Sequence, residues 1–189
     1  FILARLEADQ VPPSPEAGRE TLIRRLSLDL TGLPPTLAEI DAFLADATAG
    51  AYERGVDRLL TSPRYGERMA VDWLDAARFA DTHGFHLDSG RDMTPWRDWV
   101  IRAFNENKPY DQFVREILAA TGTVIGNPPV AWYKRVKEPK NQIEDVAQLF
   151  LGVRMQCAQC HHHPFERWSQ DDYYSLAAFF TQVGRKPSP

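Results

Sequence analysis

Apolar residues recur every three to four positions along most of the chain, and this helical period constrains the fold more than any other feature. The clearest stripes lie at Leu22, Ile23, Leu26 and Leu30, at Trp96, Trp99, Val100, Ala103 and Phe104, and at Tyr110, Phe113, Val114, Ile117 and Leu118. No segment alternates between apolar and polar residues for long enough to predict a strand. We therefore expect an all-α fold, a single multi-helix domain over residues 1–189.

Length and composition agree with a globular helical domain. A chain of 189 residues with 43% hydrophobic residues is long enough to bury roughly 70% of its unfolded surface without disulfide support. No apolar run approaches the ~20 residues that span a bilayer, so no transmembrane segment is expected in this stretch. A net charge of −4 gives no electrostatic footprint for nucleic acid.

Capping signals mark several helix ends. Ser14 before Pro15 is typical of a helix start, and Gly32 before Pro34-Pro35 is typical of a helix end. Thr36 and Glu39 have the spacing of a capping box, so we expect a helix to begin there. Ser169 and Asp172 have the same spacing before a final helix.

Two segments lack helical periodicity and are predicted to be long irregular loops, about 81–94 and 121–141. In the second, Pro128, Pro129 and Pro139 are expected to prevent a helix. The next helix is predicted from about 142 to 156, directly before the two cysteines. Long loops in a compact domain are usually functional or supported by a ligand, although simple insertions are equally compatible with this pattern.

The two cysteines stand in the segment Cys157-Ala158-Gln159-Cys160-His161, which has the C-x-x-C-H pattern of c-type haem attachment. Thiols three residues apart on one helical face can each add to a vinyl group of haem. The histidine that follows can then supply an imidazole nitrogen to the iron. We therefore predict covalently attached haem c at Cys157 and Cys160, with His161 as the proximal ligand.

Other uses of the cysteine pair stay open. The thiols could form a disulfide, or with His161 or His163 they could form part of a zinc site. A closed zinc site would need a remote ligand, for which His83 or His86 could serve. In either case the domain would be a non-redox interaction or carbohydrate-associated module. A hydrolase built on Asp72, Asp75 and Asp81 is a weaker alternative, since Arg78 offers these acids an ion-pair partner.

A sixth iron ligand, if this chain supplies one, must come from few residues. Only 28 residues follow His161, and beyond His163 they contain neither Met nor His. The candidates are His163 and the upstream His83, His86 and Met93, with Met69 as a further upstream residue. Because Pro164 restricts His163 to extended backbone, we expect His163 to organise the turn or contact a haem propionate.

Nearly the whole chain resembles the cytochrome-c-like domain of large exported proteins of planctomycete bacteria, a domain of unknown function. The matching segments are residues 29–36, 62–68, 73–75 with 78–82, 97–105, 109–113, 157–168 and 171–174. The family pattern C-x-x-C-H-x-H-P falls on Cys157, Cys160, His161, His163 and Pro164. The residue between the two histidines is commonly Asn or Asp in relatives and is His162 here.

The resemblance implies an exported, periplasmic or cell-surface setting and an electron-transfer role rather than a catalytic one. It also implies a neighbouring cytochrome c domain in the same polypeptide, which would serve as the redox partner if a separate protein does not. The chain opens Phe1-Ile2-Leu3, without an initiator methionine, so we expect it to be a domain excised from a larger multidomain protein.

Overall fold

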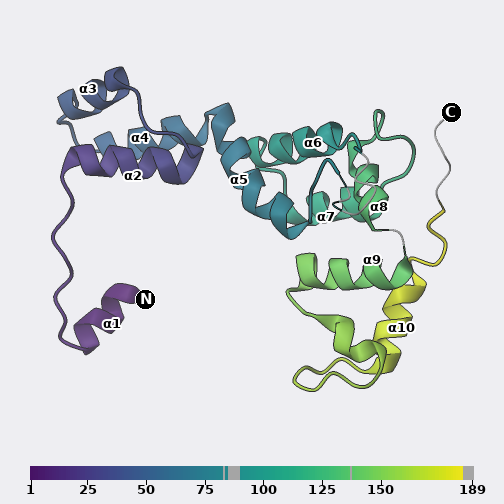
Figure 1. The fold of residues 1–189 in the computed structure, drawn as a ribbon. Coiled ribbons are helices and arrows are strands. Elements are labelled where there is room, and N and C mark those ends of the chain that lie inside the picture. Colours follow the sequence, from purple (N-terminus) through teal and green to yellow (C-terminus); the bar gives the residue numbers. More distant parts are fainter. Residues whose placement is uncertain (83, 85–89, 137, 185–189) are drawn as a thin grey trace. The chain divides into compact units, whose positions relative to one another are not determined.

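The computed structural model describes residues 1–82, 84, 90–136 and 138–184 and is built from α-helices (Figure 1). Within these residues there is no strand, and the single isolated β-bridge joins Thr82 to Gly90. The all-α prediction is therefore confirmed. No helix of the described part is long and apolar enough to cross a membrane.

The chain divides into two compact units, residues 1–68 and residues 69–189. Each unit has its own arrangement of helices and is described separately. The boundary falls within helix α5, which spans Pro63–Ala76. The expectation of one domain over residues 1–189 stays a prediction.

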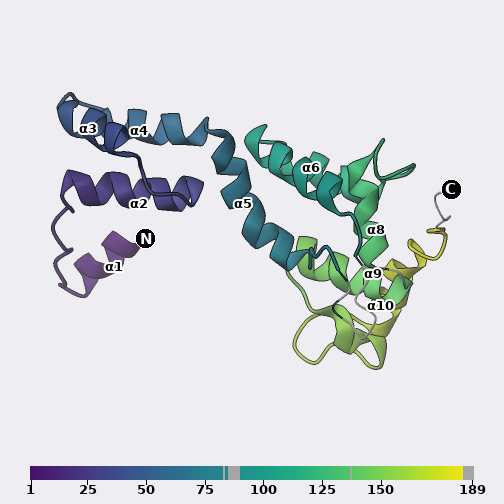
Figure 2. The ribbon, with the colours of Figure 1, turned by 45° about the horizontal axis from the view of Figure 1, so that its top comes forward.

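The first unit contains helices α1 (Ile2–Ala8), α2 (Arg19–Thr31), α3 (Leu37–Ala45) and α4 (Ala51–Leu60). Helices α2, α3 and α4 contact one another, and they lie side by side in both views of the ribbon (Figure 1, Figure 2). Ile23 and Leu26 of α2, Phe43 of α3 and Leu59 of α4 are all buried. The Thr36–Glu39 capping box is present at the start of α3, as predicted.

The predicted start of the second helix was wrong. Residues 11–18 are not helical, and α2 begins at Arg19 with Gly18 as its N-cap. Pro12, Pro13 and Pro15 favour extended backbone, and the residues between Pro15 and Gly18 offer the core only the charged Glu16 and the small Ala17. No gain in packing therefore offsets the conformational entropy that would be lost if the helix began before Arg19. Its predicted end is confirmed, because Gly32 has a φ of 71° in the left-handed region.

The second unit has two hydrophobic clusters. The first lies among α6 (Thr94–Asn105), α7 (Tyr110–Leu118), the 3-10 helix η1 (Pro128–Ala131) and α8 (Trp132–Arg135). Its centre is aromatic: the rings of Trp96 and Trp99 stack with centroids 5.6 Å apart, and Phe113 stacks on Trp99 at 5.0 Å.

The second cluster lies among α9 (Pro139–Val146), the π-helix η2 (Ala147–Leu151), the 3-10 helix η3 (Met155–Gln159) and α10 (Gln170–Ala178). In both ribbon views α9 and α10 run close together, with the η3 segment folded beside them (Figure 1, Figure 2). The capping box of Ser169 and Asp172 opens α10 as predicted.

The predicted loop over 121–141 was wrong in part. Pro128 and Pro139 occupy the first positions of η1 and α9 instead of preventing helices. At a first helical position the missing N–H would have no partner in any case, and the fixed φ of proline suits the helix. In the other predicted loop, the ends are joined by a hydrogen bond from the Arg91 N–H to the Asp81 carbonyl (2.7 Å).

The helix predicted over 142–156 also needs correction. It begins earlier, at Pro139, and its π-helical continuation ends before Gly152, which has a φ of 67°. A left-handed glycine ends a helix because it turns the chain away from the helical path. The cysteines therefore lie on the separate turn η3 and not on the end of this helix.

An ion pair with a buried carboxylate ties the segment that follows α5 to α9. Arg78 donates to Asp145 at 2.8 Å, and the Asp145 side chain is only 6% exposed, whereas that of Arg78 is 48% exposed. Arg78 is thus paired with α9, and the alternative of an active site at Asp72, Asp75 and Asp81 receives no support from this ion pair. The pair fixes the helix on which the cysteine turn packs.

We predict that Arg78→Gln lowers the free energy of unfolding by about 1–3 kcal/mol, because it removes a charged hydrogen-bond partner of the buried Asp145 carboxylate. Arg97→Gln is the matched control. Arg97 has a similarly exposed side chain (46%), but its partner Asp98 is 47% exposed, so the control should change stability by less than about 0.5 kcal/mol. Chemical denaturation of both variants measures the difference, and equal effects would contradict the assigned role of Asp145.

Candidate functional site

The two cysteines lie on the exposed side of the short turn η3. Cys157 is inside this 3-10 helix and Cys160 is its C-cap residue, with φ −108° and ψ −28°. Side chains three residues apart eclipse one another in a 3-10 helix. Both cysteines are exposed and carry free thiols. The turn therefore presents two thiols toward the same side, in solvent.

Burial of another side of η3 explains why the cysteines face outwards. Met155 and Ala158 are also three residues apart, and both are fully buried against Tyr173 and Ala177 of α10. With three residues per turn, burying this apolar pair also fixes the side of the turn on which Cys157 and Cys160 lie. Hydrophobic burial thus sets the direction of the thiols.

His161 follows Cys160 and is exposed, with one ring nitrogen engaged. Its Nδ1 lies 2.6 Å from the carbonyl oxygen of His162. A carbonyl oxygen can only accept, so Nδ1 carries the proton and Nε2 is the unprotonated nitrogen of the neutral ring. This is the arrangement in which metal-binding histidines are usually held, with the second nitrogen donating to a carbonyl.

His163 uses both ring nitrogens to hold the backbone. Its Nδ1 accepts from the N–H groups of Phe165 and Glu166 at 3.2 and 2.9 Å, and its Nε2 donates to the Arg154 carbonyl at 3.2 Å. The His163 N–H also donates to the Trp168 carbonyl at 2.8 Å. The ring therefore closes the 163–168 turn and connects it to the entry of η3, which matches the expected turn-organising role.

The other predicted iron ligands are not brought to the cysteines by described contacts. Met93 is 2% exposed and belongs to the first hydrophobic cluster, whereas η3 packs in the second. His83 and His86 lie outside the described residues. Among the residues that are described, no group of three or more His, Cys, Asp and Glu side chains could hold a metal ion.

The contacts that α10 makes to the cysteine turn were not predicted from the sequence. Gln170 and Tyr174, four residues apart on one face of α10, both donate to the Gln159 carbonyl. Beneath them the hydroxyl of the buried Tyr173 donates to Glu144 at 3.0 Å. Burial and this hydrogen bond raise the pKa of Tyr173 above its usual value. The i, i+4 spacing of Gln170 and Tyr174 was the available signal, but it does not reveal which backbone group they meet.

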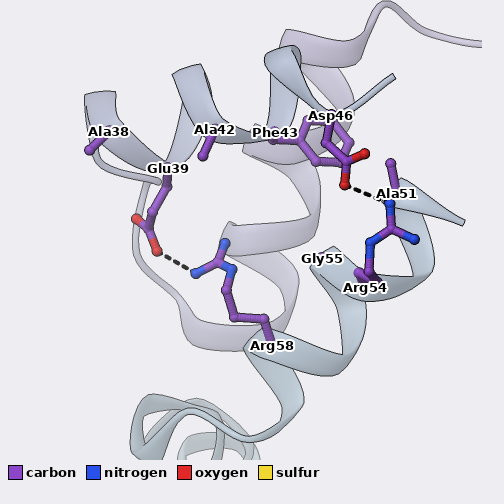
Figure 3. Close-up of a pocket in the computed structure, with 9 residues that line it drawn as sticks. All are labelled: Ala38, Glu39, Ala42, Phe43, Asp46, Ala51, Arg54, Gly55 and Arg58. Atoms are coloured by element: carbon purple, nitrogen blue, oxygen red, sulfur yellow. Dashed lines mark hydrogen bonds and ion pairs between the residues drawn. The ribbon is translucent and has the colours of Figure 1, made fainter. Parts of the chain in front are cut away.

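The first unit has a separate hollow of about 340 Å³ between α3 and α4 (Figure 3). Ala42, Phe43 and Gly55 line it, and ion pairs between Glu39 and Arg58 and between Asp46 and Arg54 cross it. Hydrogen bonds from Thr48 and Arg54 lower the pKa of Asp46 to about 2. Both arginines are thus paired with carboxylates. Neither guanidinium is left as an unpaired cation that could bind an anionic ligand in the hollow.

Comparison with protein families matches residues 1–185 to PSCyt2, described as a protein of unknown function (DUF1549). The chain belongs to this family. Membership confirms the domain of unknown function that the sequence resembles, and it assigns no ligand to the cysteines. No curated protein and no solved structure matches the chain.

We predict that His163→Ala increases hydrogen exchange at the Phe165 and Glu166 amides by about 5- to 10-fold. Each amide loses the ring nitrogen that accepts its hydrogen bond, and a bond of this kind contributes about 1 kcal/mol to the stability of the folded turn. His161→Ala is the matched control, because it removes a neighbouring imidazole without touching these amides. Equal exchange in His163→Ala and the unaltered protein would contradict the turn-organising role.

The start of α10 should loosen in acid. Hydrogen bonds from the Ser169 N–H and O–H lower the pKa of Asp172 in the folded chain. A lowered folded pKa means that this stabilisation is complete above the ordinary Asp range and is lost as the pH falls through the folded pKa. Asp172→Asn should therefore destabilise the N-terminus of α10 at neutral pH and have little effect at low pH. Backbone amide chemical shifts of residues 169–172 across an acid titration measure this, and a pH-independent difference would contradict it.

Proposed function

We propose that the chain is a c-type haem domain with an electron-transfer role, in which Cys157 and Cys160 hold the haem and His161 is its proximal ligand. One observation carries the proposal: both thiols are free, exposed and three residues apart on a 3-10 turn. In that geometry the two side chains point the same way, as attachment to two vinyl groups of one porphyrin requires.

The attachment chemistry needs only the two thiols. Each Cys S–H would add across one vinyl C=C bond, the sulfur bonding to one carbon and the hydrogen going to the other. No atom leaves, and no oxidant or reductant is consumed. The exposed position of both thiols supports this step, because the porphyrin can approach without unfolding the second hydrophobic cluster.

The tautomer of His161 is the one that a proximal ligand requires. The hydrogen bond from Nδ1 to the His162 carbonyl keeps the proton away from Nε2, so the nitrogen that would face iron has a lone pair. Such a bond also raises the basicity of the ligating nitrogen. A bound haem would supply an iron that changes oxidation state by one electron.

His163 is assigned a supporting role in the same proposal. With both ring nitrogens bonded to the backbone, it holds the exit of the motif and leaves ligation to His161. The partner would be a neighbouring cytochrome domain of the same polypeptide or a separate redox protein. Since such haem attachment follows export, the proposed location is the periplasm or the cell surface.

Production of the chain together with a cytochrome c maturation system tests the proposal. We expect a red protein whose haem stays with the polypeptide after denaturation and whose reduced pyridine adduct has the spectrum of two thioether bonds. Cys157→Ser and Cys160→Ser should each leave one thioether, and the double variant should leave none. Serine is the matched replacement, because both side chains are exposed and similar in size.

His161→Gly, with both cysteines intact, should lose the histidine-ligated spectrum, and added imidazole should restore it. A colourless protein with stoichiometric zinc would overturn the proposal in favour of a zinc module. A colourless protein with a Cys157–Cys160 disulfide would equally overturn it. Haem that the double serine variant binds as tightly as the unaltered chain would contradict covalent attachment.

A further inference from the structure

The last carbonyl of η3 is held by two donors from α10. The Gln159 oxygen accepts from Gln170 Nε2 at 3.0 Å and from the Tyr174 hydroxyl at 3.2 Å. Carbonyls at a helix end usually lack a partner from their own helix. This carbonyl belongs to the peptide unit that joins Gln159 to Cys160. The two bonds therefore fix the orientation of the backbone on which the second thiol stands.

Gln170 makes a second contact, through its backbone, to the residue after His161. Its N–H donates to Nδ1 of His162 at 3.2 Å. Gln170 is the first residue of α10, and the N–H of a first helical residue has no partner within its helix. The His162 ring supplies that partner, so the start of α10 holds the side chain of His162.

His162 is the connection between α10 and the proximal histidine. Its side chain accepts from Gln170, and its carbonyl accepts from Nδ1 of His161. The position of that carbonyl decides which way the His161 ring turns and which of its nitrogens carries the proton. A chain of hydrogen bonds thus runs from the start of α10 through His162 to His161.

We propose that Gln170, His162 and Tyr174 are positioning residues that set the placement of Cys160 and the tautomer and orientation of His161. The inference rests on the proposed haem site for its functional consequence. Gln170 and Tyr174 hold the peptide before Cys160, and Gln170 with His162 holds the carbonyl that His161 meets. The contacts to the Gln159 carbonyl set the position of the thiols. The contact between Gln170 and His162 sets the basicity of the proximal nitrogen.

The haem-loaded chain gives the first test. Gln170→Glu and Tyr174→Phe remove one donor each with little change of shape, and His162→Leu removes the acceptor. Each should still attach haem covalently, although Gln170→Glu and Tyr174→Phe should slow attachment, because the peptide before Cys160 is then held by one donor instead of two. His162→Leu should raise the midpoint potential, because a less basic proximal nitrogen stabilises oxidised iron less. His161 should also be displaced by cyanide at about tenfold lower concentration, a typical size for loss of such supporting contacts.

Two further variants separate positioning from general stability. His162→Asn keeps a side-chain oxygen that can accept from the Gln170 N–H, so it should restore the potential toward that of the unaltered chain. Ser175→Ala lies on α10 away from these contacts and should change nothing. An unchanged potential in His162→Leu would overturn the inference, as would failure of His162→Asn to differ from His162→Leu. Attachment that is as fast in Gln170→Glu and Tyr174→Phe as in the unaltered chain would contradict the role of the two side chains.

The haem-free chain gives a readout that does not depend on the proposed function. Nitrogen-15 NMR of the ring should show the neutral His161 protonated mainly at Nδ1, and His162→Leu should shift it toward the Nε2–H form by several-fold. A chain that attaches no haem but shows this tautomer would contradict the proposed function and still support the hydrogen-bond network that positions His161. A ring protonated mainly at Nε2 in the unaltered chain would overturn the network, whether or not haem is attached.

Discussion

Burial of one side of the η3 turn is the constraint on which the candidate site depends. Met155 and Ala158 are both fully buried in the cluster that α9 and α10 form around Tyr173. The turn contains only five residues, so its hydrogen bonds alone could not hold it in water. Packing supplies the stability, and because the buried side is fixed, the side on which the cysteines lie is fixed as well.

The polar contacts around the turn refine what packing establishes. His163 connects the exit of the motif to Arg154 at its entry, and Gln170 with Tyr174 holds its last carbonyl. Almost every one of these bonds ends on a backbone group rather than on another side chain. The motif is thereby held in place without using the thiols or Nε2 of His161, which are the atoms that the proposed haem attachment requires.

Local signals in the sequence predicted local structure well and longer-range structure less well. The capping boxes at Thr36 and Ser169 and the end at Gly32 were correct because each depends on residues within one helical turn. Pro128 and Pro139 were misjudged because the same residue that breaks a helix interior favours a helix start. The start of α2 was misplaced because apolar packing, and not the Ser14-Pro15 signal, decides how far a helix extends.

The sequence alone determined the helical class, the spacing of Cys157, Cys160 and His161, and the scarcity of other ligands after them. These follow from the order of residue types and need no knowledge of what packs on what. Only the tertiary structure decided that the cysteines stand on a 3-10 turn, that Met93 packs in another cluster, and that Gln170 reaches the Gln159 carbonyl. Those facts depend on contacts between residues distant in the chain, and a left-handed glycine at position 152 is enough to separate the turn from the helix before it.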